Sequence, residues 1–75
     1  MARIKCSGAE CIKILCNKFG FAVSRHRGSH VSLVKFEGTR KISTVVPLHT
    51  EIKIRTLRSA LKLGEVSEEE FLKFL

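Results

Sequence analysis

The chain has 75 residues, of which 44% are hydrophobic and 28% are charged, a balance typical of a folded protein rather than a disordered one. A chain of this length buries only about 60% of its unfolded surface, which excludes a deep enclosed pocket. No apolar run is long enough for a membrane helix and no signal peptide is visible, so we expect one cytoplasmic domain over residues 1–75 without membrane contact.

The charge is distributed unevenly along the chain. Residues 1–64 carry 13 Lys and Arg against 3 Glu, a net of +10, and residues 65–75 carry 4 Glu against 1 Lys, a net of −3, which together give the total of +7. A strongly basic body favours polyanionic partners, with nucleic acid first and an anionic membrane second. An acidic protein partner suits the same charge.

The first helix is predicted over residues 9–19. Ser7 and Glu10 have the spacing of a capping box, in which each side chain satisfies an amide at the helix start. Gly20 is the residue expected to end the helix. One apolar face follows from the spacing i, i+3, i+4, i+7 of Ile12, Leu15, Cys16 and Phe19.

Three cysteines, Cys6, Cys11 and Cys16, recur every five residues. Their odd number argues against a closed disulfide framework, and their spacing differs from that of zinc fingers. Steps of five residues rotate by about 500° along a helix, so the thiols are expected to fan out rather than converge. We therefore expect packing or idle thiols and no metal site.

Two predicted strands, residues 21–27 and 30–36, are separated only by Gly28 and Ser29. A two-residue Gly-X connection is typical of a type I′ or II′ hairpin turn, which determines the strand register. By strict alternation, Phe21 and Val23 begin one face of the first strand, and the other face carries Ala22, Ser24 and His26.

Side chains suited to chemistry on a phosphodiester lie beside this turn. Arg25 and Arg27 share one face of the first strand, and His30 follows the turn on a stiff strand. An imidazole titrates near neutral pH, and guanidinium groups beside it bind phosphate. A plain solvated histidine at a hairpin edge has the same local sequence, so both interpretations stay open at this point.

The third strand is predicted over residues 40–46, after a turn at residues 37–39. Ile42 and Val46 fall on one side of this strand and Lys41, Ser43 and Val45 on the other, and Pro47 ends the strand because proline cannot donate to a central ladder. The three strands predict an antiparallel meander, which needs helices on one face to be stable in water.

Residues 48–53 are predicted to form a loop that carries His49, followed by a second helix ending at Gly64. This helix begins at Ile54 or at Leu57, since Thr56 is a candidate N-cap. Its apolar stripe consists of Ile54, Leu57, Ala60 and Leu61. A second stripe of Arg55, Arg58 and Lys62 suits either a phosphate backbone or solvent.

Ser67 and Glu70 form a second capping box, which predicts a final helix over residues 68–75 docked by Phe71, Leu72 and Leu75. The order is α-β-β-β-α with a short extra C-terminal helix. An antiparallel sheet with both main helices on one face is an α+β two-layer sandwich, which has the order and size of the double-stranded-RNA-binding domain. Fold alone does not define function.

Five short motifs then occur in one order along nearly the whole chain: Gly20-Phe21, Gly28-Ser29-His30, Val46-Pro47-Leu48-His49, Thr56-Leu57-Arg58 and Glu69-Glu70-Phe71-Leu72. In this order and spacing they resemble the HicA (YcfA-like) toxin family of bacteria and archaea. The chain departs from the family pattern at Arg55, where glycine is common, which alters the entry into the second helix and adds a charge.

The resemblance implies a small messenger-RNA interferase of a type II toxin–antitoxin system, neutralised by a HicB-like antitoxin in a complex. It also implies the double-stranded-RNA-binding type of fold. The catalytic histidine of the family maps onto His30, and Gly28 and Ser29 match the turn of that motif. His49 matches the histidine after the Val-Pro pair, and its role stays open.

With this resemblance, we expect metal-independent RNA cleavage without a cofactor, in which His30 acts as general base or general acid. His26 and His49 are the candidates for a second acid–base group. The carboxylates Glu10, Glu37 and Glu51 fall in different elements, which argues against a two-metal nuclease. Residues expected to contact RNA or stabilise its charge are Arg25, Arg27, Gly28, Ser29, Lys35, Lys41 and His49.

Two other functions fit the same residues. One is a non-catalytic module that binds double-stranded RNA by shape and backbone. The other is a basic interaction protein for an acidic partner. Tyr and Trp are absent and the five Phe are mostly expected in the core, so few side chains are candidates for stacking on RNA bases.

Overall fold

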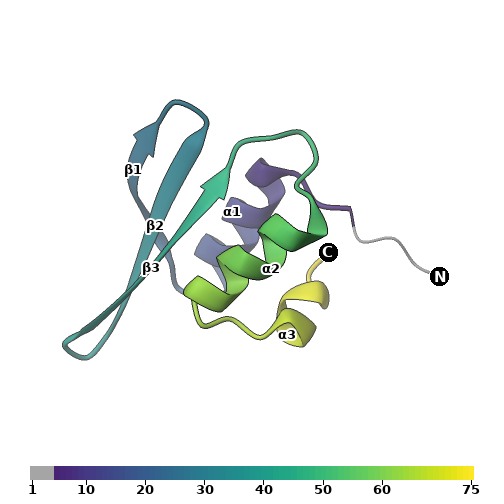
Figure 1. Ribbon diagram of the computed structural model, residues 1–75. Coiled ribbons are helices and arrows are strands. Elements are labelled where there is room, and N and C mark those ends of the chain that lie inside the picture. The colour runs from purple at the N-terminus through teal and green to yellow at the C-terminus, as the bar shows by residue number, and fades with distance from the viewer. Residues whose placement is uncertain (1–4) are drawn as a thin grey trace.

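The computed structural model describes residues 5–75, so the first four residues of the predicted domain lie outside the described range (Figure 1). The described residues confirm the predicted α+β order with a short C-terminal helix, a topology consistent with the double-stranded-RNA-binding domain. The elements are α1 (Gly8–Lys18), β1 (Ala22–Arg27), β2 (His30–Glu37), β3 (Arg40–Pro47), α2 (Ile54–Leu63) and α3 (Glu68–Leu72).

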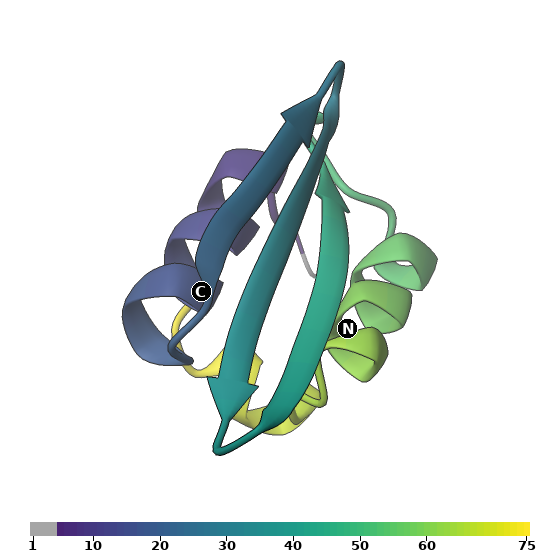
Figure 2. The same ribbon diagram turned by 90° about the vertical axis from the view of Figure 1, so that its left-hand side faces the viewer.

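The three strands form one antiparallel sheet in the order β1-β2-β3. Both long helices lie on one side of this sheet, and no helix among residues 5–75 covers the other side, which Figure 2 shows from the front. We refer to this second side as the helix-free face. From the strand register, it carries Ala22, Arg25, Arg27, His30, Ser32, Val34, Phe36, Lys41, Ser43, Val45 and Pro47, and Ser24 lines a groove on the same side.

Both predicted serine caps are confirmed, and so is Ile54 as one of the two predicted starts of the second helix. The Ser7 hydroxyl accepts a hydrogen bond from the Glu10 amide at 3.0 Å, and Ser67 does the same for Glu70 at 3.3 Å. For α2, the helix begins at Ile54 after Lys53, which provides no side-chain cap. The prediction of Thr56 as N-cap is therefore wrong, because Thr56 already lies inside the first helical turn.

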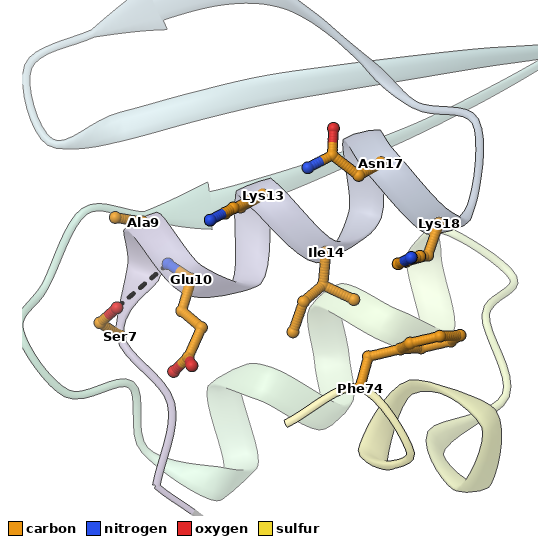
Figure 3. A pocket seen from close by; sticks show the side chains of 8 residues that line it. All are labelled: Ser7, Ala9, Glu10, Lys13, Ile14, Asn17, Lys18 and Phe74. Carbon is orange, nitrogen blue, oxygen red and sulfur yellow. Dashed lines mark hydrogen bonds between the residues drawn. The ribbon is translucent and has the colours of Figure 1, made fainter.

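The end of the last helix also differs from the prediction. α3 ends at Leu72, because the amides of the final residues bond to carbonyls three positions back, and Leu75 is exposed rather than docked. Phe74 packs edge-on against Phe19, with ring centroids 5.8 Å apart. Its ring borders an open hollow of about 600 Å³ along the outer side of α1, between Ile14 and Lys18 (Figure 3).

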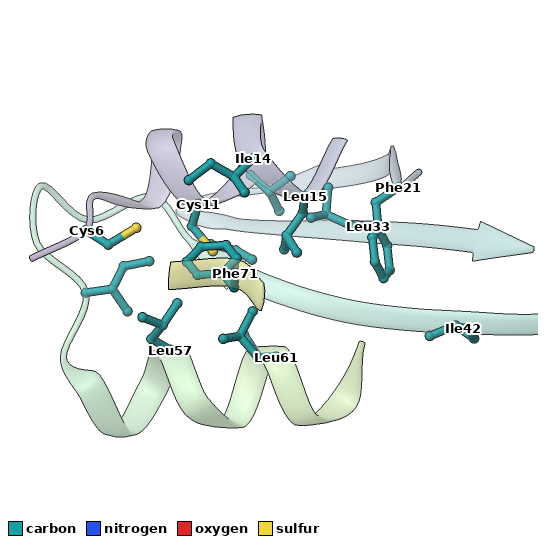
Figure 4. Close-up of a cluster of buried hydrophobic side chains, with 14 residues drawn as sticks. Cys6, Cys11, Ile14, Leu15, Phe21, Leu33, Ile42, Leu57, Leu61 and Phe71 are labelled. Carbon is teal, nitrogen blue, oxygen red and sulfur yellow. The ribbon is translucent and has the colours of Figure 1, made fainter. Parts of the chain in front are cut away.

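The core lies between the sheet and the helices (Figure 4). α3 contributes Phe71, whose fully buried side chain lies between the side chains of α1 and those of α2. The buried face of α1 is wider than predicted: Cys11 and Ile14 are buried with Leu15, while the predicted Ile12, Cys16 and Phe19 are partly buried. In α2 the predicted stripe is confirmed except for the exposed Ile54. The sheet contributes Val31, Leu33, Ile42 and Val46.

The start of α1 lies against the end of β3. The Gly8 amide donates to the His49 carbonyl at 2.8 Å, and the Ile52 amide donates to the Cys6 carbonyl at 2.8 Å. A Cβ atom at Gly8 would lie 2.0 Å from the Pro47 carbonyl oxygen. Only glycine therefore permits this approach of helix to strand, which holds the loop after β3 in place.

Replacing Gly8 with alanine is expected to lower the free energy of unfolding by about 1–3 kcal/mol, because backbone must move to admit the methyl group. At a helix position without such contacts, Gly→Ala raises stability by about 0.4–1 kcal/mol. Urea unfolding therefore distinguishes a crowded glycine, at which alanine lowers the free energy of unfolding, from an uncrowded one, at which alanine raises it. Ala9→Ser at the exposed neighbouring position is the control, and a Gly8→Ala variant as stable as the wild type would contradict the contact.

The thiols of Cys6 and Cys11 are buried and Cys16 is partly buried, as expected for packing thiols. The expectation that they fan out is wrong for one pair, because Cys6 precedes the helix and its thiol lies beside that of Cys11. Burial, together with this neighbouring thiol, raises the pKa of the Cys11 thiol from 9.0 to about 12. The folded chain therefore keeps a proton that the unfolded chain loses above pH 9.0.

This difference predicts that the free energy of unfolding falls as the pH rises from about 9 towards 12. The contribution of Cys11 to this slope is at most about 1.4 kcal/mol per pH unit. Urea unfolding between about pH 8 and 11 should show a shallower decline for Cys11→Ala than for the wild type. Parallel pH profiles of the two proteins would show that the thiol is not protected by burial.

Candidate functional site at the hairpin tip

The turn between β1 and β2 consists of Gly28 and Ser29, as predicted. Gly28 has a φ of +59°, while Ser29 is not among the residues with positive φ. Positive φ at only the first turn residue is the pattern of a type II′ turn, which decides between the two predicted turn types. A Cβ atom at Gly28 would have no neighbour within 4 Å, so glycine is needed there for its backbone conformation alone.

The turn sets the register that assembles the site. Arg27 lies directly opposite His30, and Arg25 lies opposite Ser32. Opposed residues of an antiparallel pair have Cβ atoms about 4.5–5.5 Å apart and point to the same side of the sheet. The exposed His30 imidazole therefore shares the helix-free face with two exposed guanidinium groups.

A β-bulge in β1 makes this arrangement possible. Val23 lies opposite Leu33 and Arg25 opposite Ser32, so Ser24 is an extra residue between two consecutive pairs. The Ser24 hydroxyl donates to the Ser32 carbonyl at 3.3 Å. Strict alternation along this strand was thus the wrong prediction: after the bulge, His26 lies opposite Val31 on the helix side, and no longer shares a face with Ala22.

The third strand brings a second histidine to this end of the sheet. Pro47 lies opposite His30, and the Leu48 amide donates to the Ser29 carbonyl at 2.6 Å. These contacts hold the loop that carries His49 beside the turn. Of the two histidines predicted as a second acid–base group, His49 therefore lies next to the site, whereas His26 lies on the opposite face.

The two predicted lysines lie elsewhere. Lys35 lies opposite Ile42 on the helix side, where its ammonium nitrogen is 5.7 Å from the centre of the Phe21 ring and 3.7 Å from Glu37. The structure therefore does not bring Lys35 to His30. Lys41 is on the helix-free face but lies opposite Phe36, at the far end of β2, which is about 20 Å from His30 along the strand.

Acidic side chains are absent from the helix-free face of the described strands. Glu37, the acidic residue of the strands, lies on the helix side with Arg40, whose guanidinium contacts Glu65 at 2.6 and 2.8 Å. Hydrogen bonding to Arg40 holds the pKa of the Glu65 carboxyl below its ordinary value. Within residues 5–75, none of the ion pairs involves the arginines beside His30, which leaves their charge available to an anion.

A shallow groove of about 330 Å³ crosses all three strands on the helix-free face. It begins at the pair Arg25–Ser32 and extends to Lys41. Its serines were not among the predicted site residues, although Ser32 lies two residues after His30 on β2 and therefore on the same face of the sheet. The groove is lined by Ser24, Arg25, Ser32, Leu33, Lys41, Ser43, Thr44 and Val45.

The remaining predicted features lie away from this site. In the basic stripe of α2, the Arg58 side chain donates to Glu68 at 2.9 Å, so this stripe is partly neutralised. The hollow beside α1 contains none of the predicted site residues. In the described part of the chain, no three His, Cys, Asp or Glu side chains are placed to hold a metal ion, and no helix is long and apolar enough to cross a membrane.

Comparison with known proteins identifies the family. Residues 8–65, well over half of the chain, match the family model described as the HicA toxin of bacterial toxin–antitoxin systems. No curated protein and no solved structure matched the chain. The matched segment contains the hairpin turn, the histidine that follows it and the loop pinned beside it. The chain therefore belongs to the HicA toxin family of bacterial toxin–antitoxin systems.

Proposed function

We propose that this toxin is an endoribonuclease that cleaves messenger RNA without a metal ion, with His30 as its catalytic residue. The observation that carries the proposal is the hairpin register, which sets His30 opposite Arg27 and next to Arg25 on an exposed face without acidic residues. Family membership supports the toxin role. A messenger-RNA substrate makes the cytoplasm the expected place of action.

In the proposed reaction, His30 removes the proton of a ribose 2′-hydroxyl. The 2′-oxygen then attacks the adjacent phosphorus, the bond from phosphorus to the 5′-oxygen breaks, and that oxygen takes up a proton. The products are a 2′,3′-cyclic phosphate and a free 5′-hydroxyl. Arg25 and Arg27 would stabilise the added negative charge on the phosphorane, and His49 is the candidate proton donor to the leaving oxygen.

This reaction needs no cofactor, and the site offers no evident ligand set for one. The described residues bring no three candidate metal ligands together, and the carboxylates Glu10, Glu37 and Glu51 remain in separate parts of the fold. We therefore expect cleavage to continue in the presence of a chelator. Gly28, Ser29 and Lys41 stay in the proposed RNA-contacting set, whereas Lys35 leaves it because it faces the helices.

The family implies an antitoxin partner. We propose that a HicB-like protein neutralises the toxin in a stable complex by covering the hairpin tip. The exposed arginines and His30 offer a basic surface to an acidic segment of such a partner. This contact would block RNA access and lower the repulsion among unpaired positive charges.

Replacing His30 with alanine is expected to lower RNA cleavage by on the order of 10²- to 10⁴-fold, because a general acid–base group is lost. The matched control is His26→Ala, which removes an exposed histidine from the same hairpin but from the opposite face. Each protein is induced in a host without the antitoxin, and growth and messenger-RNA integrity are followed. Purified proteins are assayed on RNA with and without a chelator.

If the wild type neither arrests growth nor fragments RNA, the ribonuclease proposal fails, and a non-catalytic RNA-binding module becomes the better account. If the wild type and His30→Ala cleave equally, the catalytic group lies elsewhere, and His49→Ala is the next variant. Equal loss in His26→Ala would show that the effect is not specific to the helix-free face.

The two hairpin turns provide a second test. Gly28 and Gly38 have φ values of +59° and +63°, and a Cβ atom at either would meet nothing within 4 Å. Alanine at either position should therefore lower stability by a similar amount, about 1–2 kcal/mol. Gly28→Ala should also lower cleavage far more than Gly38→Ala does, because the Gly28 turn positions His30 and the other turn lies at the opposite end of β2. If both variants cleave RNA equally well, the conformation of the Gly28 turn is not needed for activity.

A further inference from the structure

We propose that the helix-free face binds a single strand of RNA along its length, with Phe36 as a stacking platform for an unpaired base. Arg25 and Lys41 would contact phosphates along the same path, which leads to His30. This inference deepens the proposed ribonuclease function and rests on it for the identity of the substrate. It adds contacts far from the reacting phosphate, which the chemistry at the hairpin tip does not require.

Phe36 is an exposed aromatic residue on the helix-free face. Its side chain is 65% exposed, the largest exposed fraction among the large hydrophobic side chains described. Expecting the phenylalanines mostly in the core was wrong at this position, because Phe36 has the same alternation phase as His30 and so lies on the helix-free face. An exposed aromatic ring on an open sheet is the arrangement on which unpaired RNA bases stack.

The neighbours of Phe36 suit a nucleic-acid strand. Lys41 lies directly opposite Phe36, so the two side chains project from the same side of the sheet, where a phosphate would follow a stacked base. The groove then runs towards the hairpin tip past the hydroxyls of Ser43 and Ser32, which are able to bond ribose or base edges. Arg25 lines the end of the groove nearest to His30, and Lys41, the partner of Phe36, lines its other end, so the groove connects the two regions.

The positive charge of the helix-free face favours RNA as its ligand. The helix-free face carries Arg25, Arg27 and Lys41 without an acidic side chain from the described strands, while Lys35 and Arg40 on the other side are paired with glutamates. Phosphates along a strand complement such a surface. A stacking platform serves bases that are unpaired, since bases within an RNA duplex are already stacked, so the path fits a single strand.

A fluorescence experiment tests the path directly. The chain has no Trp and no Tyr, so Phe36→Trp introduces its only indole. This change is made together with His30→Ala, so that the RNA stays intact during titration. A short unstructured oligoribonucleotide should quench the indole in a saturable manner, whereas the same titration of Leu63→Trp, at a similarly exposed position on α2, should leave its emission unchanged.

Binding affinity gives a second readout. In the His30→Ala background, Phe36→Ala should weaken binding of the single-stranded oligonucleotide by about tenfold or more, with a smaller effect on a duplex of the same sequence. Lys41→Ala should lower the slope of log affinity against log salt by about 0.7. The matched controls, Leu63→Ala and Lys62→Ala on α2, should bind like their parent. Circular dichroism confirms that each variant is folded.

The outcomes separate the two proposals. Quenching in the Phe36→Trp protein but not in Leu63→Trp, with no cleavage by the wild type, would support the RNA path and overturn the ribonuclease function. Cleavage that depends on His30, with no quenching and unchanged binding in Phe36→Ala and Lys41→Ala, would overturn the path alone. If these variants lose affinity for the antitoxin but bind RNA normally, the face is a protein interface and the RNA path is overturned.

Discussion

The site depends on one extra residue, Ser24, which interrupts the alternation of inward and outward side chains along β1. The two-residue turn forces Arg27 and His30 onto the same face, and burial of Leu33 in the core sends both outward. Uninterrupted alternation back along β1 would then turn Phe21 outward as well, yet its side chain is 4% exposed in the core. The bulge at Ser24 shifts this alternation by one residue, so Phe21 is buried in the core while Arg25 and Arg27 lie on the helix-free face.

The alternation of side chains along the strands also determines on which face of the sheet each charged residue lies. Lys35 and Arg40 fall on the helix side, where glutamates pair with both, and the Arg40–Glu65 contact joins the sheet to the end of α2. Arg25 and Lys41 fall on the other side, where the described strands offer no carboxylate. Arg25, Arg27 and Lys41 thereby share one open surface without a carboxylate from the described strands, which is the physical basis for an anionic ligand there.

Backbone contacts between distant segments hold the site in shape. Gly8 permits the start of α1 to touch the end of β3, and its amide binds the His49 carbonyl. On the other side of the same loop, the Leu48 amide binds the Ser29 carbonyl within the turn. A chain of this size has little core with which to immobilise loops, and these short contacts replace it. They explain how an exposed histidine obtains a defined position without burial.

Most of the architecture was determined by local sequence. Serine caps, apolar periodicity and two glycine turns predicted every helix and strand, and the predicted Gly28-Ser29 turn determines the register that pairs His30 with Arg27. Those features act over a few residues, so sequence spacing reveals them. The separation of Lys35 from His30 follows from alternation, since the two are five residues apart on one regular strand. Only the tertiary structure decided the bulge in β1 and the exposure of Phe36. The bulge reconciles a buried Phe21 with outward-facing arginines, and Phe36 is exposed because the helices cover the other side of the sheet.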